Sequence, residues 1–247
     1  RLSLAARVLD ADARHQWYLA QRSVDDSPTA TEALNGSFDE SRAKELMRRY
    51  GISSPQSVMC ESRDAALSAF EKLTKPVVVK IASADVAHKT EVGGVILNVA
   101  SDDEFKAALE QSSKIPTSTP DRVLIEEMVP EGVDLIVGGV RDTSWGPCVV
   151  VGLGGVLAEA VSDSSVAIAP FGPEDVERML ESLRGKKILD GFRNLPACDR
   201  QAIIETAAAI GQMLEEHPEI TEIEINPLRA NELGAIALDA RVVLNDE

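Results

Sequence analysis

Apolar and polar positions divide the chain into a short N-terminal part and a longer globular body. Over residues 2–22 the apolar side chains recur at helical spacing, which predicts an amphipathic helix. Residues 23–37 are rich in Ser, Thr, Asp and Pro and indicate a linker. We therefore expect residues 1–36 to form an N-terminal helix and linker, with the body beginning near Ser37.

Within the body, helical spacing of apolar residues predicts several helices. Ser37 and Glu40 have the spacing of a capping box, and Gly51 has the position of a residue that ends the same helix. Asp102 precedes another apolar stripe as a candidate N-cap. The remaining predicted helices cover residues 63–73, 102–111, a segment opened by Pro173, and about 199–216.

Short runs of β-branched and apolar residues, bounded by Gly, Pro and polar residues, predict strands between these helices. The predicted strands cover residues 77–81, 95–99, 123–128, 133–140, 148–151, 156–161, 166–169, 220–225 and 235–239. Helices and strands do not alternate strictly, so the pattern favours an α+β fold with a boundary near residues 120–130.

Composition and charge restrict the classes of partner. The chain has 247 residues and a formal net charge of −16, and such a surface repels nucleic acid and anionic membranes. Apolar runs stay shorter than the roughly 18 residues of a membrane span. Cys60, Cys148 and Cys198 are widely spaced, so we expect reduced thiols and a cytoplasmic protein without nucleic-acid or membrane partners.

The segment from Lys80 to Val95 combines residues that suit a nucleotide phosphate site. Lys80 ends an apolar run, Lys89 follows nine residues later, and Gly93 and Gly94 can bring backbone N–H groups close to a ligand. Each signal alone also has a purely structural explanation, since a strand lysine commonly faces solvent and glycine pairs commonly form turns. Their combination suggests phosphoryl transfer from a nucleoside triphosphate.

His88 lies in the same segment, on a polar stretch with no apolar face to pack against. A neutral imidazole can accept a phosphoryl group, although a lone histidine is more often structural. His15 and His217 are expected to be surface residues of helices.

The region near the C-terminus offers oxygen ligands for Mg²⁺. If residues 220–225 and the following residues form a strand, Glu224 and Asn226 share one face of it. Asp239 lies on the next predicted strand, so these three side chains would converge on one hard cation if the strands are neighbours. The alternative is a solvated strand face that ends in a turn at Asn226 and Pro227.

Seven blocks of sequence occur in order between about Ser41 and Leu244. They are Ala43 to Leu46 with Tyr50 to Ile52, Val79 to Lys89, Gly93 to Val95, Glu126 to Val129, Gly138 to Asp142 with Gly146 and Pro147, Gly152 to Gly155 with Glu159 and Asp163, and Glu224 to Pro227 with Asp239 to Arg241. Together these blocks resemble the ATP-grasp domain of ADP-forming acyl-CoA synthetases of the acetate–CoA ligase type, relatives of the succinyl-CoA synthetase β subunit.

The resemblance implies an ATP-grasp fold in which two lobes clamp ATP or ADP with Mg²⁺. The N-terminal lobe would cover residues 37–125, and the C-terminal lobe, with the Mg²⁺-binding strands, residues 126–247. His88 would relay the phosphoryl group, with Lys89 as the second catalytic residue. The other implied sites are Lys80 and Lys89 on the phosphates, Gly93 and Gly94 over them, Glu126, Glu127, Met128 and Val129 as the adenine hinge, Asp134 at the ribose, and Glu224, Asn226 and Asp239 at the metal.

The implied reaction joins a carboxylic acid to CoA, with ATP giving ADP and phosphate. It is reversible and passes through an acyl phosphate and a phosphohistidine, which a CoA-ligase (α) subunit or domain would carry while it binds CoA and the acid. Two departures stand out: Asp134 replaces the family's Glu, and Asn194 replaces a Gly. These departures leave open a non-catalytic ligase-like module of a fused protein acetyltransferase. An ATP-grasp carboxylate–amine ligase is a second alternative, which His88 and Lys89 disfavour because it needs no histidine relay.

Overall fold

The computed structural model describes residues 33–83, 86, 89, 92–119, 121–155, 163–169, 171–193 and 195–245. The helix expected over residues 2–22, most of the expected linker and the strand expected over residues 156–161 lie outside the described residues, as do His88, Glu159 and Asn194.

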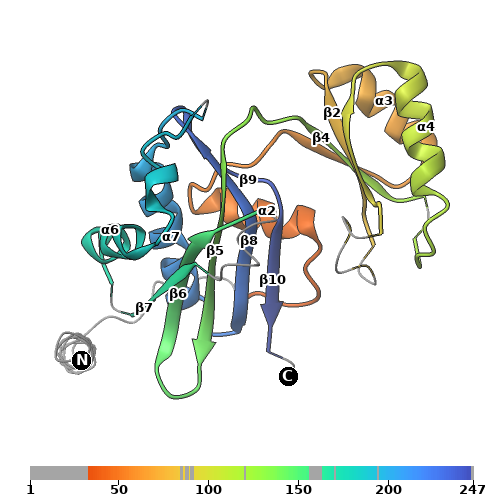
Figure 1. The fold of residues 1–247 in the computed structure, drawn as a ribbon. Coiled ribbons are helices and arrows are strands. Elements are labelled where there is room, and N and C mark those ends of the chain that lie inside the picture. The colour runs from red at the N-terminus through yellow and green to blue at the C-terminus, as the bar shows by residue number, and fades with distance from the viewer. Residues whose placement is uncertain are drawn as a thin grey trace, which may run out of the picture.

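A four-stranded antiparallel sheet with the strand order β1-β4-β2-β3 forms the first body, at the upper right of Figure 1. Its strands are β1 (Ser57–Cys60), β2 (Val77–Ile81), β3 (Val95–Val99) and β4 (Val123–Glu127). The helices α3 (Arg63–Lys72) and α4 (Asp102–Ser112) pack on this sheet. Phe70 and Phe105, one from each helix, stack with ring centroids 4.2 Å apart and fill the small core.

The second body is a six-stranded antiparallel sheet in which β10, β8, β5, β6 and β7 follow one another and β9 pairs with β8. Its strands are β5 (Val133–Asp142), β6 (Gly146–Leu153), β7 (Ser164–Ile168), β8 (Ile220–Asn231), β9 (Gly234–Ala237) and β10 (Ala240–Leu244). The helices α6 (Pro173–Ser182) and α7 (Arg200–Glu216) cover one face of this sheet, and the 3-10 helix η1 (Lys186–Ile188) follows α6 (Figure 1).

The helix α2 (Glu40–Arg49) precedes the first sheet in sequence but packs against β10 of the second. Ala43, Leu46 and Met47 of this helix belong to the larger core because its apolar stripe faces the second sheet. The expected N-terminal lobe, residues 37–125, therefore contributes to both cores. This placement brings the polar side chains of α2 between the two sheets.

Two helix starts differ from the sequence expectation. Asp39, rather than Ser37, caps α2, and its carboxylate accepts from the backbone N–H of Arg42 at 2.9 Å. Ser101, rather than Asp102, caps α4. The reason is geometric, since a cap must have extended backbone and reach the N–H two or three residues ahead. Neighbouring polar residues compete for that position, and pattern alone does not choose between them.

Two further expectations are tested by the fold. β8 continues through Asn226 and Pro227 to Asn231, so these two residues lie within a strand and the alternative of a turn there is wrong. Cys60, Cys148 and Cys198 are free thiols, as predicted, and all three are buried. The helices among the described residues are too short or too polar to cross a membrane.

Candidate nucleotide site

A cluster of buried charges lies where the two sheets meet. Lys80 of β2 and Glu126 of β4 come from the first sheet. Glu40 and Lys44 come from α2, and the backbone carbonyl of Leu238 comes from the link between β9 and β10. The four charged residues are between 0% and 8% exposed, although such residues are rarely buried without partners. We call these residues, with Lys89, the ion cluster.

The hydrogen bonds of Lys44 and Lys80 use the full donor capacity of both ammonium groups. Lys44 donates to Glu40 Oε1 at 2.8 Å and to Glu126 Oε1 at 2.6 Å. Lys80 donates to Glu40 Oε1 at 2.8 Å and pairs with Glu126 Oε2 at 2.6 Å. Both groups also donate to the carbonyl oxygen of Leu238, at 2.6 Å and 2.7 Å respectively. Because an ammonium group has three hydrogens, a phosphate would have to displace one of these acceptors from Lys80.

Lys89 extends the cluster at its edge. Its ammonium group pairs with Glu40 Oε2, and its side chain is 15% exposed, compared with 8% for Lys80. Among the described residues this is the ion pair that Lys89 makes, and it uses one of its three hydrogens. Of the two lysines predicted to contact phosphates, Lys89 is therefore the more accessible.

The charges in the cluster stabilise one another. Burial alone would raise the pKa of Glu40, but the positive charges of Lys80 and the other two lysines outweigh burial and hold that pKa far below its usual range. Burial alone would lower the pKa of Lys80, but Glu40 and Glu126 outweigh it and raise that pKa. For Asp239, burial and then the charge of Glu40 raise the pKa, against the attraction of the lysines. Glu40 and Lys80 are consequently both charged at neutral pH.

The predicted metal ligands lie on β8 and on the link that follows β9. The strand predicted over residues 235–239 ends at Ala237, so Asp239 lies in the link between β9 and β10 beside Asn226 of β8. The backbone N–H of Asn226 donates to the carbonyl of Asp239 at 3.2 Å, and the Asn226 amide donates to Glu224 Oε1 at 3.0 Å. Ile223 and Ile225 point into the core on the other face of β8, as the alternation predicted. The set offers two carboxylates and one amide, which are donors that Mg²⁺ accepts. Among the described residues, no three His, Cys, Asp or Glu side chains group as a metal site, so this set would rely on the amide.

Gly93 and Gly94 lie at the start of β3, beside the end of β2. The Gly94 N–H donates to the Lys89 carbonyl at 2.7 Å, and the Gly94 carbonyl accepts from Ile81 N–H at 2.9 Å. A Cβ on Gly94 would lie 2.5 Å from Ile81 Cδ1 and 3.0 Å from the Lys89 carbonyl oxygen, so a larger residue would require the Ile81 side chain to shift. Gly93 has a φ of +73°, which favours glycine. Gly94 thus holds the backbone of Lys89 near the end of β2.

Three of the four residues predicted as the adenine hinge already make hydrogen bonds or ion pairs within or beside the first sheet. The side chain of Glu126 belongs to the ion cluster. The N–H groups of Glu127 and Met128 donate to the carbonyls of Gln56 and Pro76, at 2.9 Å and 3.1 Å. Val129 follows in the link that leads to the second sheet.

Asp134, predicted near the ribose, forms a two-pronged ion pair within the second sheet. Arg229 lies directly opposite it on β8. The guanidinium donates from Nε to Asp134 Oδ1 at 2.8 Å and from Nη2 to Oδ2 at 3.0 Å. A ribose hydroxyl would therefore share Asp134 with this arginine.

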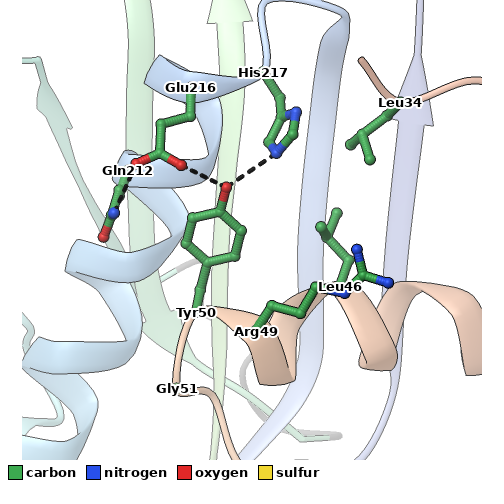
Figure 2. A pocket seen from close by; sticks show the side chains of 8 residues that line it. All are labelled: Leu34, Leu46, Arg49, Tyr50, Gly51, Gln212, Glu216 and His217. Carbon is green, nitrogen blue, oxygen red and sulfur yellow. Dashed lines mark hydrogen bonds between the residues drawn. The ribbon is translucent and has the colours of Figure 1, made fainter. Parts of the chain in front are cut away.

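A recess lies elsewhere, between the C-terminal ends of α2 and α7 (Figure 2). Its volume is about 540 Å³, and none of the predicted site residues lines it. Figure 2 shows the Tyr50 hydroxyl between Glu216 and His217, at 2.7 Å and 3.0 Å. His217 is 1% exposed, so the expectation of a surface position for it was wrong: α7 ends against α2 and buries the ring.

Sequence reasoning missed Glu40 and Lys44 as parts of the site. Their spacing of four residues on a helix is a signal for an ion pair. Such pairs are usually exposed, and nothing in the local pattern indicates that this one is buried against β2 and β4.

Comparison with known proteins agrees with this architecture. The sequence model of the ATP-grasp domain family matches residues 29–244, beginning before the first block of the resemblance. The ADP-forming acetate–CoA ligase I subunit beta of Pyrococcus furiosus is 35% identical, over 86% of this chain and 94% of that subunit. The ADP-forming acetate–CoA ligase II of Archaeoglobus fulgidus is 33% identical over 84% of this chain, which spans only 30% of that longer protein.

A solved structure shows the same fold. Acetyl-coenzyme A synthetase 1 of Ca. Korarchaeum cryptofilum, in complex with coenzyme A and Mg-AMPPCP, aligns with a TM-score of 0.74 and 36% identity. The alignment covers 85% of this chain and 93% of that one. In the Korarchaeum structure the phosphohistidine segment points towards the nucleotide binding site. The chain therefore belongs to the ATP-grasp domain family, and the expected α+β ATP-grasp fold is confirmed. Within that family its similar relatives include beta subunits of ADP-forming acetate–CoA ligases.

Proposed function

We propose that this chain is the nucleotide-binding, phosphoryl-transferring half of an ADP-forming acyl-CoA synthetase. The observation that carries the proposal is the ion cluster with its three lysines beside the Asn226–Asp239 edge, in a chain that matches 94% of a beta subunit. The partner would be a CoA-ligase subunit or domain that carries a phosphohistidine and binds CoA and a small carboxylic acid. A cytoplasmic location is proposed with it, supported by three free, buried thiols.

In the proposed mechanism the residues of this chain hold the nucleotide and neutralise its charge. Glu224, Asn226 and Asp239 would hold Mg²⁺, which would offset negative charge on the phosphates. Lys89 would donate its remaining hydrogens to a phosphate oxygen, while Lys80 would act through its charge from within the cluster.

His88 would pass the phosphoryl group between the nucleotide and the partner. A new bond from an imidazole nitrogen to phosphorus would form as the bond from phosphorus to the partner's histidine breaks, and the transfer to ADP would follow in the same way. We expect His88→Ala to abolish phosphoryl exchange with the partner while leaving Mg-nucleotide binding largely intact. Persistent exchange in this variant would contradict the relay.

The proposal is tested first by calorimetric titration of the chain with ADP and ATP, with and without Mg²⁺. Binding should depend on Mg²⁺ and should be lost or strongly weakened in Asp239→Asn. Glu232→Gln, which removes a charge from the exposed turn between β8 and β9, is the matched control and should bind as the wild type does. A wild-type chain that binds no nucleotide, alone or with the CoA-ligase half, would contradict the proposal.

A non-catalytic module is the second candidate, because Lys80 donates all three of its hydrogens within the chain and both oxygens of Asp134 already accept from Arg229. The same titration separates the two candidates, since a degenerate module would bind neither nucleotide with the CoA-ligase half present.

A further inference from the structure

The carboxylate of Glu40 lies where an anionic ligand would be expected to bind. Its oxygens accept from three ammonium groups, those of Lys44, Lys80 and Lys89. It is also the first residue of α2, and the N-terminus of a helix favours negative charge. A site built from three lysines and a helix N-terminus suits a phosphate group, but here the protein supplies the anion itself.

The three lysines differ in how many other acceptors they have and in how exposed they are. Lys44 and Lys80 each have two further acceptors, Glu126 and the Leu238 carbonyl, and are almost completely buried. Lys89 lies at the edge, is more exposed, and among the described residues pairs with Glu40. An incoming anion can therefore take Lys89 with the least disturbance of the cluster.

We propose that Glu40 is a positioning residue that competes with nucleotide phosphate for the Lys89 ammonium group and thereby lowers nucleotide affinity. The proposal rests on the proposed function, because it takes a nucleotide as the ligand. In the structure Glu40 holds Lys89 against the cluster. When a nucleotide binds, a phosphate oxygen replaces Glu40 Oε2 as the partner of Lys89, while Glu40 Oε1 remains with Lys44 and Lys80.

The competition predicts a gain of affinity, which damage to the fold would not produce. Glu40→Asp keeps the charge but shortens the side chain by one methylene, so it loses its reach to Lys89 and should raise ADP affinity about threefold. Glu40→Gln removes the competing charge and should raise ADP affinity about fivefold. Lys89→Met should lower ADP affinity about tenfold, because a hydrogen bond to a charged group is lost.

The double variant Glu40→Gln with Lys89→Met tests whether Glu40 changes ADP affinity through Lys89. If Glu40 acts through Lys89, this variant should bind ADP no more tightly than Lys89→Met alone. It removes one charge of each sign, which keeps the cluster balanced. Glu45→Gln is the matched control on the same helix, since Glu45 is exposed and pairs with Arg49, and it should leave ADP affinity unchanged.

ADP affinity is measured by calorimetry with Mg²⁺ present, and circular dichroism and thermal unfolding establish that each variant is folded. If Glu40→Gln does not fold, the inference is tested by the ADP affinities of Glu40→Asp and of the charge-balanced double variant. Unchanged or weaker binding in folded Glu40→Asp would overturn the inference, and so would a gain that persists without Lys89. In either case tight binding by the wild type would leave the proposed function standing, whereas a wild type that fails to bind would contradict both.

Discussion

At the residue scale, the half-buried Tyr50 provides a hydrogen-bond partner for the buried His217. The Tyr50 hydroxyl contacts Glu216 and His217 Nε2, while His217 Nδ1 lies 3.2 Å from Glu219 Oε1. Burial, and then the hydrogen bond to Glu216, raises the pKa of Tyr50. The folded protein therefore holds the phenolic proton more tightly than the unfolded chain does.

We predict that Tyr50→Phe lowers the free energy of unfolding by about 1–3 kcal/mol, because it leaves buried His217 Nε2 without its partner. Urea unfolding at pH 7 measures this loss. Gln212→Ala, which removes a donor to Glu216 from the exposed side, is the control and should cost under about 0.5 kcal/mol. Equal losses in the two variants would contradict the importance of the Tyr50 hydroxyl.

The same residue has a predictable effect at high pH. Because the folded pKa of Tyr50 is raised, its contribution to stability is fully present below the ordinary tyrosine pKa of about 10 and is lost as pH rises from there towards the folded pKa. The stability difference between wild type and Tyr50→Phe should therefore shrink above about pH 10. A difference that stays constant through that range would contradict the assignment.

At the scale of elements, α4 begins with a complete capping box. Ser101 Oγ accepts from the backbone N–H of Glu104 at 3.3 Å, and the Glu104 carboxylate accepts from the N–H of Ser101 at 3.0 Å. Phe105 follows directly and packs into the core of the first sheet. The cap therefore orients the turn that carries a core aromatic residue.

We predict that Ser101→Ala destabilises the protein by about 1 kcal/mol, because one of the first N–H groups of the helix loses its acceptor. Ser113→Ala at the other end of α4 is the matched control, since its hydroxyl donates only to an exposed carbonyl, that of Glu110. Denaturant unfolding compares the two, and a larger loss in Ser113→Ala would contradict the prediction.

At the scale of the whole molecule, the ion cluster joins the two sheets. Lys44 from α2 contacts Glu126 of the first sheet and the Leu238 carbonyl beside the second. Buried ion pairs contribute little net stability against an apolar replacement, but removing one partner leaves an uncompensated charge. The cluster thus stabilises one relative arrangement of the sheets more than it stabilises either sheet.

We predict that Lys44→Met lowers the free energy of unfolding by about 3–5 kcal/mol, because Glu40 and Glu126 lose a shared counter-charge. Lys106→Met on the exposed side of α4 is the control and should change stability by less than about 0.5 kcal/mol. Denaturant unfolding measures the loss, and hydrogen exchange should show reduced protection in both sheets. Reduced protection in one sheet alone would contradict the coupling.

Much of the fold was predictable where the signal is local. The strands at Val77–Ile81 and Val95–Val99 have the predicted bounds, because each is a compact apolar run between turn residues. Two strands were missed, Ser57–Cys60 and Ala240–Leu244, because short edge strands carry weak alternation. The predicted strand over residues 220–225 extends to Asn231, since pairing with β9 and β5 continues it beyond its apolar part.

The sequence by itself determined the family, the α+β composition and the residue types that suit phosphate and Mg²⁺ chemistry, because motifs and periodicity are properties of consecutive residues. Only the tertiary structure decided that α2 packs on the second sheet, and with it that Glu40 and Lys44 meet Lys80 and Glu126 of the first sheet. The physical reason is distance along the chain. Glu40, Lys80 and Leu238 are brought together by packing, and the burial that makes their charges interact strongly exists only once both sheets have formed.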